Sequence, residues 1–421
     1  MAQLSDDCFA HGAPLMRAEE ALGLLDRRLV ALTETEAVSL AEATGRILAA
    51  PVVSDRDVPP HDNSAVDGYA VYHDDLDADV ETRLPVTGRA AAGHPLERPA
   101  ERGEAIRIFT GAPMPRGHHG DPDTVMMQED CRLDGASVIL APGIERGANR
   151  RRRGEDVRAG SLILDRGRRL RAHDVGLVAS IGRTELPVYR RLGVAVLSTG
   201  DEVREPGTSL EPGAVYDANR YCLMGLLSGL GCEVDDLGIL PDSDMEIRER
   251  LLRSGESHDL IIASGGVSAG EEDHVRSAVE SLGRIHFWKL AIKPGRPVAM
   301  GQIGATPFIG LPGNPAAMVV TFMWLARPAV LRLSGAVALK PNVFKVRASF
   351  DHTKKRNRRE YLRARLRRGP DGALEATKFP RHGAGILTSL VESDGLVELG
   401  EDLTRLSAGT MVDFMPFSEL S

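Results

Sequence analysis

The chain is poor in cysteine and in aromatic residues, and it has no long apolar run. Its 421 residues include four Cys, none of them in a CxxC pair, so neither a zinc site nor a disulfide framework is expected. Aromatic residues make up only 4% of the chain, which argues against a base-stacking surface. The most apolar stretch, residues 316–326, ends at Arg327 and is about half as long as a membrane span. Because the N-terminal segment also lacks the apolar core of a signal peptide, we expect a soluble, cytoplasmic protein.

The charge balance excludes a further class of protein. Lys and Arg number 52 against 60 Asp and Glu, a formal net charge of −8. A mildly acidic chain lacks the excess of cations that nucleic-acid binding draws on, so neither nucleic acid nor a membrane is expected as a partner. The length exceeds what one hydrophobic core supports, which predicts two to four domains.

The chain divides into four successive regions with different sequence patterns. A helical pattern opens it, and from about residue 56 short β-like runs separated by Gly and Pro predict an all-β module that ends near residue 156. A short helix and an extended connector lead to Gly193. Strands then alternate with helices, which indicates right-handed βαβ units and a mostly parallel sheet. After Pro341 the runs are β-like again, typical of a small barrel or sandwich.

Three glycine-containing loops follow predicted strands of the α/β region, at residues 198–202, 264–270 and 311–315. Glycine lets backbone N–H groups approach an anion, and ligands of parallel sheets lie at the carboxyl ends of the strands. Asn314 is expected to cap the next helix, and Pro315 suits its first turn. One such loop is most simply a tight turn, but three at one sheet edge favour an anion pocket.

Carboxylates lie just past predicted strand ends of the same region, at Asp201, Glu202, Asp242 and Asp273. Asp242 alone could equally be a helix cap. Acids beside an anion pocket would repel the ligand unless a divalent cation lay between them, and oxygen ligands without His or Cys favour Mg²⁺ over zinc.

Basic residues are concentrated in three runs, at 150–153, 289–296 and 354–359. The first two are candidates for gripping an oxyanion, although solvated surface is the alternative for both. The third run is expected in a solvated hairpin. Asp67 precedes an apolar strand, where burial of a charge is costly. With no GxSxG, HExxH, Walker or GxGxxG motif, the residues themselves indicate a Mg²⁺-dependent enzyme for a phosphorylated or oxyanionic small molecule and no more.

Eight ordered motifs resemble those of the molybdopterin molybdenumtransferases, the MoeA family that includes the gephyrin E domain. The resemblance runs from about residue 14 to the C-terminus. It departs from the family at His61, where an aromatic residue is common, and at Val66, where Met is common. The motifs are DVPPHDNSAVDGYAV, IFTGAPMP, RRRGEDV, LSTGDEV, DANR, SGGVSAGEEDHV, FWKLAIKPGRP and GLPGNPAAM.

The resemblance implies a reaction and an architecture. Such enzymes insert molybdenum from molybdate into adenylylated molybdopterin, release AMP and depend on Mg²⁺. They are homodimers whose active site lies between the β module of one subunit and the α/β domain of the other. The implied domains are a discontinuous linker domain (14–55 with 157–190), a β-rich module (56–156), a molybdopterin-binding α/β domain (191–338) and a C-terminal β-barrel domain (339–421).

The resemblance also implies site residues, to which the glycine loops are added from the pattern itself. Asp67, Glu202, Asp242 and Asp273 are the candidate catalytic residues. Glu202, Asp242 and Asp273 are the candidate Mg²⁺ ligands. The candidate substrate-binding residues are Thr110, Arg151, Asp156, Ser198, Thr199, Gly200, Gly265, Gly266, Ser268, Lys289, Lys293, Pro312, Gly313, Asn314 and Pro315.

Two other functions remain open at this point. A molybdopterin adenylyltransferase has a similar α/β domain with its glycine loops, but it normally lacks the β module. A non-catalytic molybdopterin-binding scaffold, as in gephyrin's receptor clustering, uses the same fold. For the transferase, the implied protein partners are the molybdopterin adenylyltransferase and the molybdoenzymes that receive the cofactor.

Overall fold

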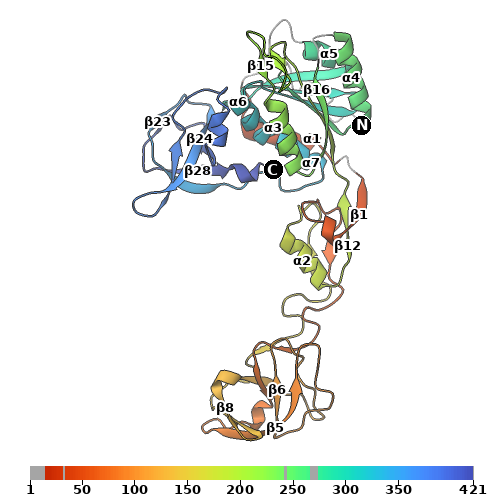
Figure 1. The fold of residues 1–421 in the computed structure, drawn as a ribbon, viewed down its shortest axis with the longest axis vertical. Helices are drawn as coiled ribbons and strands as arrows, with labels where there is room; N and C mark the ends of the chain where they lie inside the picture. The colour runs from red at the N-terminus through yellow and green to blue at the C-terminus, as the bar shows by residue number, and fades with distance from the viewer. Residues whose placement is uncertain (1–14, 32–33, 241–243, 266–273, 421) are drawn as a thin grey trace. The chain divides into compact units, whose positions relative to one another are not determined.

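A computed structural model describes residues 15–31, 34–240, 244–265 and 274–420. The chain forms two compact units (Figure 1). The larger unit comprises Met1–Ala50, Gly167–Arg171 and Glu185–Ser421, and the smaller comprises Pro51–Arg166 and Ala172–Thr184. The division into four domains at residues 56, 156, 190 and 338 stays a prediction.

The smaller unit is built on a six-stranded sheet in the order β7-β4-β6-β5-β9-β8, in which only β5 and β6 run parallel. Side chains alternate between two cores, so Ala70 and Ile106 pack on one face of the sheet while Tyr69 and Leu84 pack on the other. Its elements are β2 (Val52–Val53), β3 (Asn63–Ser64), β4 (Gly68–Val71), η2 (His73–Asp75), β5 (Thr82–Ala90), β6 (Ala105–Ile108), β7 (Thr124–Met127), η3 (Gln128–Asp130), β8 (Cys131–Asp134), β9 (Ser137–Leu140), β10 (Arg150–Arg151), β11 (Leu162–Leu164) and α2 (Ala172–Ser180).

The α/β part of the larger unit holds a six-stranded sheet in the order β16-β13-β17-β21-β20-β18. The first four strands are parallel, as the βαβ pattern predicts, and β20 and β18 add an antiparallel edge. The elements of this part are α1 (Ala18–Arg28), β13 (Gly193–Ser198), β14 (Val203–Arg204), β15 (Val215–Tyr216), α3 (Asn219–Gly229), β16 (Glu233–Ile239), α4 (Asp244–Ser257), β17 (Leu260–Ser264), α5 (His274–Leu282), β18 (Gly283–Lys289), β20 (Pro297–Ile303), β21 (Thr306–Leu311), α6 (Pro315–Thr321), the π-helical η4 (Phe322–Ala326) and α7 (Arg327–Leu333).

Helices cover both faces of this sheet (Figure 1), with α4 and α5 on one side and α1, α3 and α7 on the other. The sequence of strand β13 is a continuous apolar run because both faces of the strand are buried. Val194 and Val196 pack in the core on one face, while Ala195 and Leu197 pack in the core on the other, as expected for a strand buried on both faces. The helical run Pro315–Leu333 is long and apolar enough to cross a membrane, but 89% of it is buried inside the protein, where it serves as the central core helix.

The C-terminal part of the larger unit is a closed β-barrel. Strands β24, β25, β22, β28 and β26 pair in turn, and β26 pairs back with β24. Strand β19, which lies just after β18 in the chain, adds to β24 in parallel. The elements of the barrel are β19 (Ile292–Lys293), β22 (Phe344–Ala348), β23 (His352–Thr353), β24 (Arg359–Arg368), β25 (Leu374–Lys378), α8 (Thr388–Val391), β26 (Gly395–Leu399), β27 (Arg405–Leu406), β28 (Met411–Pro416) and η5 (Phe417–Glu419).

Three further elements of the larger unit lie outside these two parts. Strand β1 (Thr35–Ser39) pairs with β12 (Glu185–Tyr189) in an antiparallel ribbon, and η1 (Leu40–Glu42) follows β1.

The expectation of a solvated hairpin at residues 354–359 holds for the exposed turn at 355–357 but is wrong at both ends of the run. Lys354 and Arg359 are buried at the two ends of this run. Lys354 Nζ donates to the Leu403 carbonyl at 2.8 Å, and the Arg359 guanidinium pairs with Glu398 and Glu401 at 3.0 and 3.1 Å. Distant carboxylates and carbonyls therefore compensate both buried cations, which the local charge run could not indicate.

Candidate functional site

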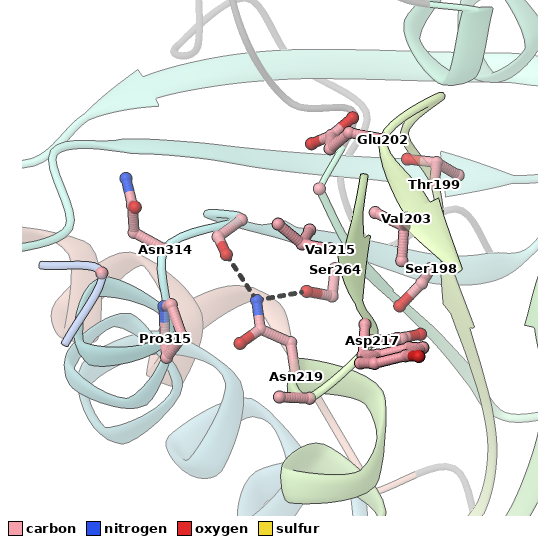
Figure 2. Close-up of a pocket in the computed structure, with 15 residues that line it drawn as sticks. Ser198, Thr199, Glu202, Val203, Val215, Asp217, Asn219, Ser264, Asn314 and Pro315 are labelled. Carbon is pink, nitrogen blue, oxygen red and sulfur yellow. Dashed lines mark hydrogen bonds between the residues drawn. The ribbon is translucent and has the colours of Figure 1, made fainter. Parts of the chain in front are cut away.

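A cavity of about 490 Å³ opens at the carboxyl edge of the parallel strands (Figure 2). Segments far apart in the sequence meet there because β13, β17 and β21 are neighbours in register, so that Ser198 pairs with Ser264 and Ser264 with Leu311. The loops that follow these strands therefore start side by side. The cavity is lined by Ser198, Thr199, Glu202, Val203, Val215, Tyr216, Asp217, Ala218, Asn219, Ser264, Gly265, Gly313, Asn314, Pro315 and Gly385.

Glycine is needed where these loops touch. Gly265 has φ +84°, and a Cβ there would lie 2.5 Å from the Thr199 carbonyl oxygen. A Cβ on Gly313 would contact the Gly265 Cα at 3.9 Å. The backbones of the loops after β13 and β17 thus pass too close for a side chain at Gly265, whereas a Cβ at Gly313 would make only an ordinary contact.

Buried polar atoms line the same cavity. The hydroxyls of Ser198 and Thr199 and the Oδ1 atom of Asn219 are buried and have no hydrogen-bond partner among the described residues. The amide nitrogen of Asn219 donates to Ser264 Oγ at 3.0 Å and to the Gly313 carbonyl oxygen at 2.7 Å (Figure 2). The cavity is therefore polar and is built from neutral groups at its base.

An ion-pair cluster supports one wall of the cavity. Arg220, at the start of α3, donates through Nε to Asp217 at 3.0 Å and also pairs with Glu205 and Asp236. The side chains of Arg220 and Asp217 are each only 2% exposed. Because its partners lie in three segments, Arg220 ties the β14–β15 arm and β16 to the start of α3.

Glu202 is the one candidate metal ligand that the described part of the chain contains. It is exposed at the rim of the cavity (Figure 2). Asp242 and Asp273, with Gly266 and Ser268, lie outside the described residues. Within the described ranges, no group of three His, Cys, Asp or Glu side chains is placed to hold a metal ion.

A second cavity of about 400 Å³ lies on the other side of the residue 312–315 turn. Asn314 lines both cavities. Asn314 occupies the N-cap position of α6 and Pro315 its first turn, as predicted, but the Asn314 side chain makes no capping hydrogen bond. The second cavity is lined by Lys293, Pro294, Gly295, Pro297, Pro312, Asn314, Ala317, His352, Glu360, Tyr361, Leu362, Arg363, His382, Gly383 and Ala384.

A buried carboxylate holds Lys293 at this second cavity. Lys293 Nζ lies 3.4 and 3.5 Å from the two carboxylate oxygens of Glu360, whose side chain is 1% exposed. The same carboxylate pairs with His352 at 3.1 Å and with Arg358 at 2.7 Å. Burial opposes the ionisation of Glu360, but the hydrogen bonds from His352 and Arg358 and the charge of Lys293 hold its pKa below the usual value. Glu360 is thus an anion that pairs with two cations, Lys293 and Arg358.

Lys289 does not line either cavity. It is exposed at the end of β18, and its backbone carbonyl accepts from the Met16 N–H at 2.9 Å. Gly200, with φ +133°, lies next to the first cavity against the Glu202 carboxylate.

Two of the candidate residues of the smaller unit, Asp67 and Thr110, contact each other beside the start of β4. Asp67 Oδ1 accepts hydrogen bonds from the Thr110 N–H and the Thr110 hydroxyl, both at 2.8 Å. These two bonds lower the pKa of Asp67, and the charge of Arg107 adds to the effect. Arg151 and Asp156 are exposed, and the structure gives them no contact with Asp67.

Sequence reasoning missed several residues that line the two cavities. Asp217, Asn219 and Ser264 belong to quoted motifs, and the DANR string that opens a helix was the available signal for the first two. Glu360 and Arg363 lie in the barrel, about seventy positions after Lys293, so only the fold brings them together.

The fold defines a multidomain protein with a mixed α/β domain, which has a polar cavity at the carboxyl ends of its parallel strands, and a closed C-terminal β-barrel. Three family profiles match the chain: "MoeA N-terminal region (domain I and II)" at residues 16–182, "Probable molybdopterin binding domain" at 195–332 and "MoeA C-terminal region (domain IV)" at 345–417. The chain belongs to the molybdopterin molybdenumtransferase (MoeA) family, which confirms the resemblance.

Individual relatives agree along nearly the whole chain. The molybdopterin molybdenumtransferase of Haemophilus influenzae is 38% identical over 92% of this chain and 95% of its own. Molybdopterin molybdenumtransferase 2 of Mycobacterium tuberculosis (strain H37Rv) is 33% identical over 89% and 93%. The crystal structure of the molybdopterin biosynthesis MoeA protein from Pyrococcus horikoshii OT3 superposes with a TM-score of 0.82 at 28% identity, over 96% of this chain and all of that one. The predicted fold class, with a mixed α/β domain and a C-terminal barrel, is confirmed.

Proposed function

We propose that this protein is a molybdopterin molybdenumtransferase, which inserts molybdenum from molybdate into the dithiolene of adenylylated molybdopterin and releases AMP. Relatives that cover most of the chain carry that name. The observation that carries the proposal is the first cavity, where three close-packed loops present hydroxyls and main-chain groups beside a rim carboxylate. Such a floor suits phosphate oxygens.

The roles of individual residues follow from their chemistry. Ser198, Thr199 and the loops around Gly265 and Gly313 would bind the phosphate of the adenylylated substrate. Lys293 lies in a cavity that also contains Arg363, and these two cations suit a dianion such as molybdate. The ionised Asp67 carboxylate would orient the substrate or accept a proton, and Glu202 has the same two possible roles. Thr110, Pro312 and the exposed Lys289, Arg151 and Asp156 remain proposed substrate contacts.

A magnesium ion fits the donor chemistry of the first cavity. The exposed Glu202 carboxylate makes no ion pair with any residue that the structure describes, so its oxygens are free to bind a hard cation. Glu202, Asp242 and Asp273 would hold the ion. When bound, Mg²⁺ would screen the charge on the phosphates and help AMP to leave.

The decisive test is a turnover assay with adenylylated molybdopterin. AMP release should require both molybdate and Mg²⁺. Formation of adenylylated molybdopterin from ATP and molybdopterin would instead identify an adenylyltransferase. Tight molybdopterin binding without any turnover would identify a scaffold.

The metal assignment predicts a shifted Mg²⁺ requirement in Asp242→Asn and Asp273→Asn. Loss of a carboxylate ligand should raise the Mg²⁺ concentration that gives half-maximal AMP release by about tenfold or more. Asp201→Asn is the matched control, because Asp201 is exposed beside Glu202 but is not a proposed ligand. Mg²⁺ titrations that coincide with those of the unmodified protein in both variants would remove these residues from the metal site.

The proposed catalytic residues fall in both compact units, and we propose that the active form is a cytoplasmic homodimer. Sedimentation at micromolar concentration should give about twice the 45.4 kDa chain mass. A fully active monomer would contradict this. The enzyme would receive its substrate from the molybdopterin adenylyltransferase and deliver the finished cofactor to molybdoenzymes.

A further inference from the structure

Asn219 connects two of the three loops that form the first cavity. It lies at the start of α3 and is buried. Its two amide hydrogens are both used, one on Ser264 Oγ and one on the Gly313 carbonyl oxygen. Ser264 ends β17, and Gly313 lies between β21 and α6. One side chain from a third element therefore fixes the spacing of these two loops (Figure 2).

The orientation of the Asn219 amide follows from its partners. A backbone carbonyl can only accept a hydrogen bond, so the atom facing Gly313 at 2.7 Å must be the nitrogen. The same nitrogen faces Ser264, so the serine oxygen is the acceptor of that bond. Figure 2 shows the nitrogen directed at Ser264 and the amide oxygen directed away from it.

This leaves the Ser264 hydroxyl with a donor function. Its oxygen already accepts from Asn219, and no acceptor for its hydrogen lies among the residues that the structure describes. Ser264 lines the first cavity and is buried. A hydroxyl held in this way presents its hydrogen to the cavity, where an anionic oxygen would be the strongest acceptor.

We propose that Asn219 is a positioning residue, which acts through the Ser264 hydroxyl and the Gly313 turn to bind a phosphate oxygen of the ligand. This inference rests on the proposed function, because the ligand is taken to be the adenylylated substrate and its product AMP. Asn219 does not contact the ligand in this account. Its contribution is to hold a donor in a fixed direction before the ligand arrives.

A double-mutant cycle with AMP as the probe tests this coupling. Asn219→Ala and Ser264→Ala should each weaken AMP binding about tenfold, as expected when a hydrogen bond to a charged group is lost. The dissociation constant of the double variant for AMP should exceed that of either single variant by at most about twofold, because both changes remove the same contact. Titration calorimetry measures the dissociation constants, and the KM for adenylylated molybdopterin should rise in parallel.

Thr306→Val is the matched control for a merely structural effect. Thr306 is buried at the opposite end of β21, and the single hydrogen of its hydroxyl is shared between two backbone carbonyls, those of Gly255 at 2.7 Å and His258 at 3.2 Å. This variant should lower the melting temperature and leave the affinity for AMP unchanged. Asn219→Ser replaces Asn219→Ala if the alanine variant fails to fold, since its short hydroxyl cannot span both partners.

The outcomes separate this inference from the proposed function. An unmodified protein that neither binds nor releases AMP would count against the proposed function. An unmodified protein that does both, together with additive effects in the cycle, would overturn the positioning role. The positioning role would also be overturned if Ser264→Ala bound AMP as tightly as the unmodified protein. The same holds if an Asn219 variant, like Thr306→Val, lost thermal stability but kept its affinity for AMP.

Discussion

Replacing Lys293 by methionine should lower molybdate-dependent AMP release at least tenfold and leave thermal stability nearly unchanged. A charge-assisted contact to molybdate or to the substrate phosphate is worth about 1.5–3 kcal/mol, which corresponds to about a ten- to hundredfold loss of turnover at low substrate. Stability should hold because the Lys293 side chain is 54% exposed, and the buried Glu360 keeps its bonds to His352 and Arg358.

The same loss is expected for Lys289→Met if its proposed substrate contact is correct. The two lysines differ in the structure, since Lys293 lines the second cavity and Lys289 lines neither. Raising the molybdate concentration should partly restore turnover for whichever lysine contacts that anion. Turnover assays at low and high molybdate measure this difference.

Lys345→Met is the matched control for these two variants. Lys345 is exposed on the barrel and pairs with Asp413 at 3.0 Å. Removing such a surface ion pair costs under about 1 kcal/mol and should not change turnover. If Lys293→Met behaved like Lys345→Met at low molybdate, the basic stretch would be solvated surface after all.

The α/β fold could be predicted because its signals are local. Three of the four parallel strands, β13, β17 and β21, are largely apolar runs, whereas the edge strand β16 carries exposed acidic residues. The alternation of Val194 and Ala195 between two cores explains why no polar face appears in β13. The loops after β13, β17 and β21 could be predicted to lie at one edge of the sheet, because the carboxyl ends of parallel strands lie on the same side.

Contacts between distant segments could not be predicted from local patterns. Lys293 meets Glu360 only because β19 pairs with β24 of the barrel. From the sequence, Arg359 belongs to a basic run that resembles solvated surface. In the structure its guanidinium is buried and pairs with Glu398 on β26 and with Glu401 just after that strand. Asn219 reads as an ordinary helix-start residue, and its bond to Gly313 depends on the closure of the turn before α6.

Replacing Arg220 by methionine should destabilise the larger unit by about 3–5 kcal/mol, the cost of breaking a buried ion pair by removing one partner. Arg220 and Asp217 are each 2% exposed, and the two further carboxylates on Glu205 and Asp236 face the same guanidinium. Methionine fills much of the volume but leaves the Asp217 charge with only a backbone N–H partner, at 3.1 Å. The melting temperature should therefore fall by about 10 °C.

Two companion variants identify the uncompensated charge as the cause. Arg253→Met removes an exposed ion pair to Glu249, with Arg253 76% exposed, and should change stability by less than about 1 kcal/mol. Adding Asp217→Asn to Arg220→Met should recover part of the lost stability, because the buried negative charge is then absent. Calorimetric unfolding of the three variants measures these differences. Two results would contradict this role of the Arg220 cluster in holding β14, β15 and β16 to the cavity wall. One is a melting temperature of Arg220→Met equal to that of Arg253→Met. The other is a further loss of stability when Asp217→Asn is added to Arg220→Met.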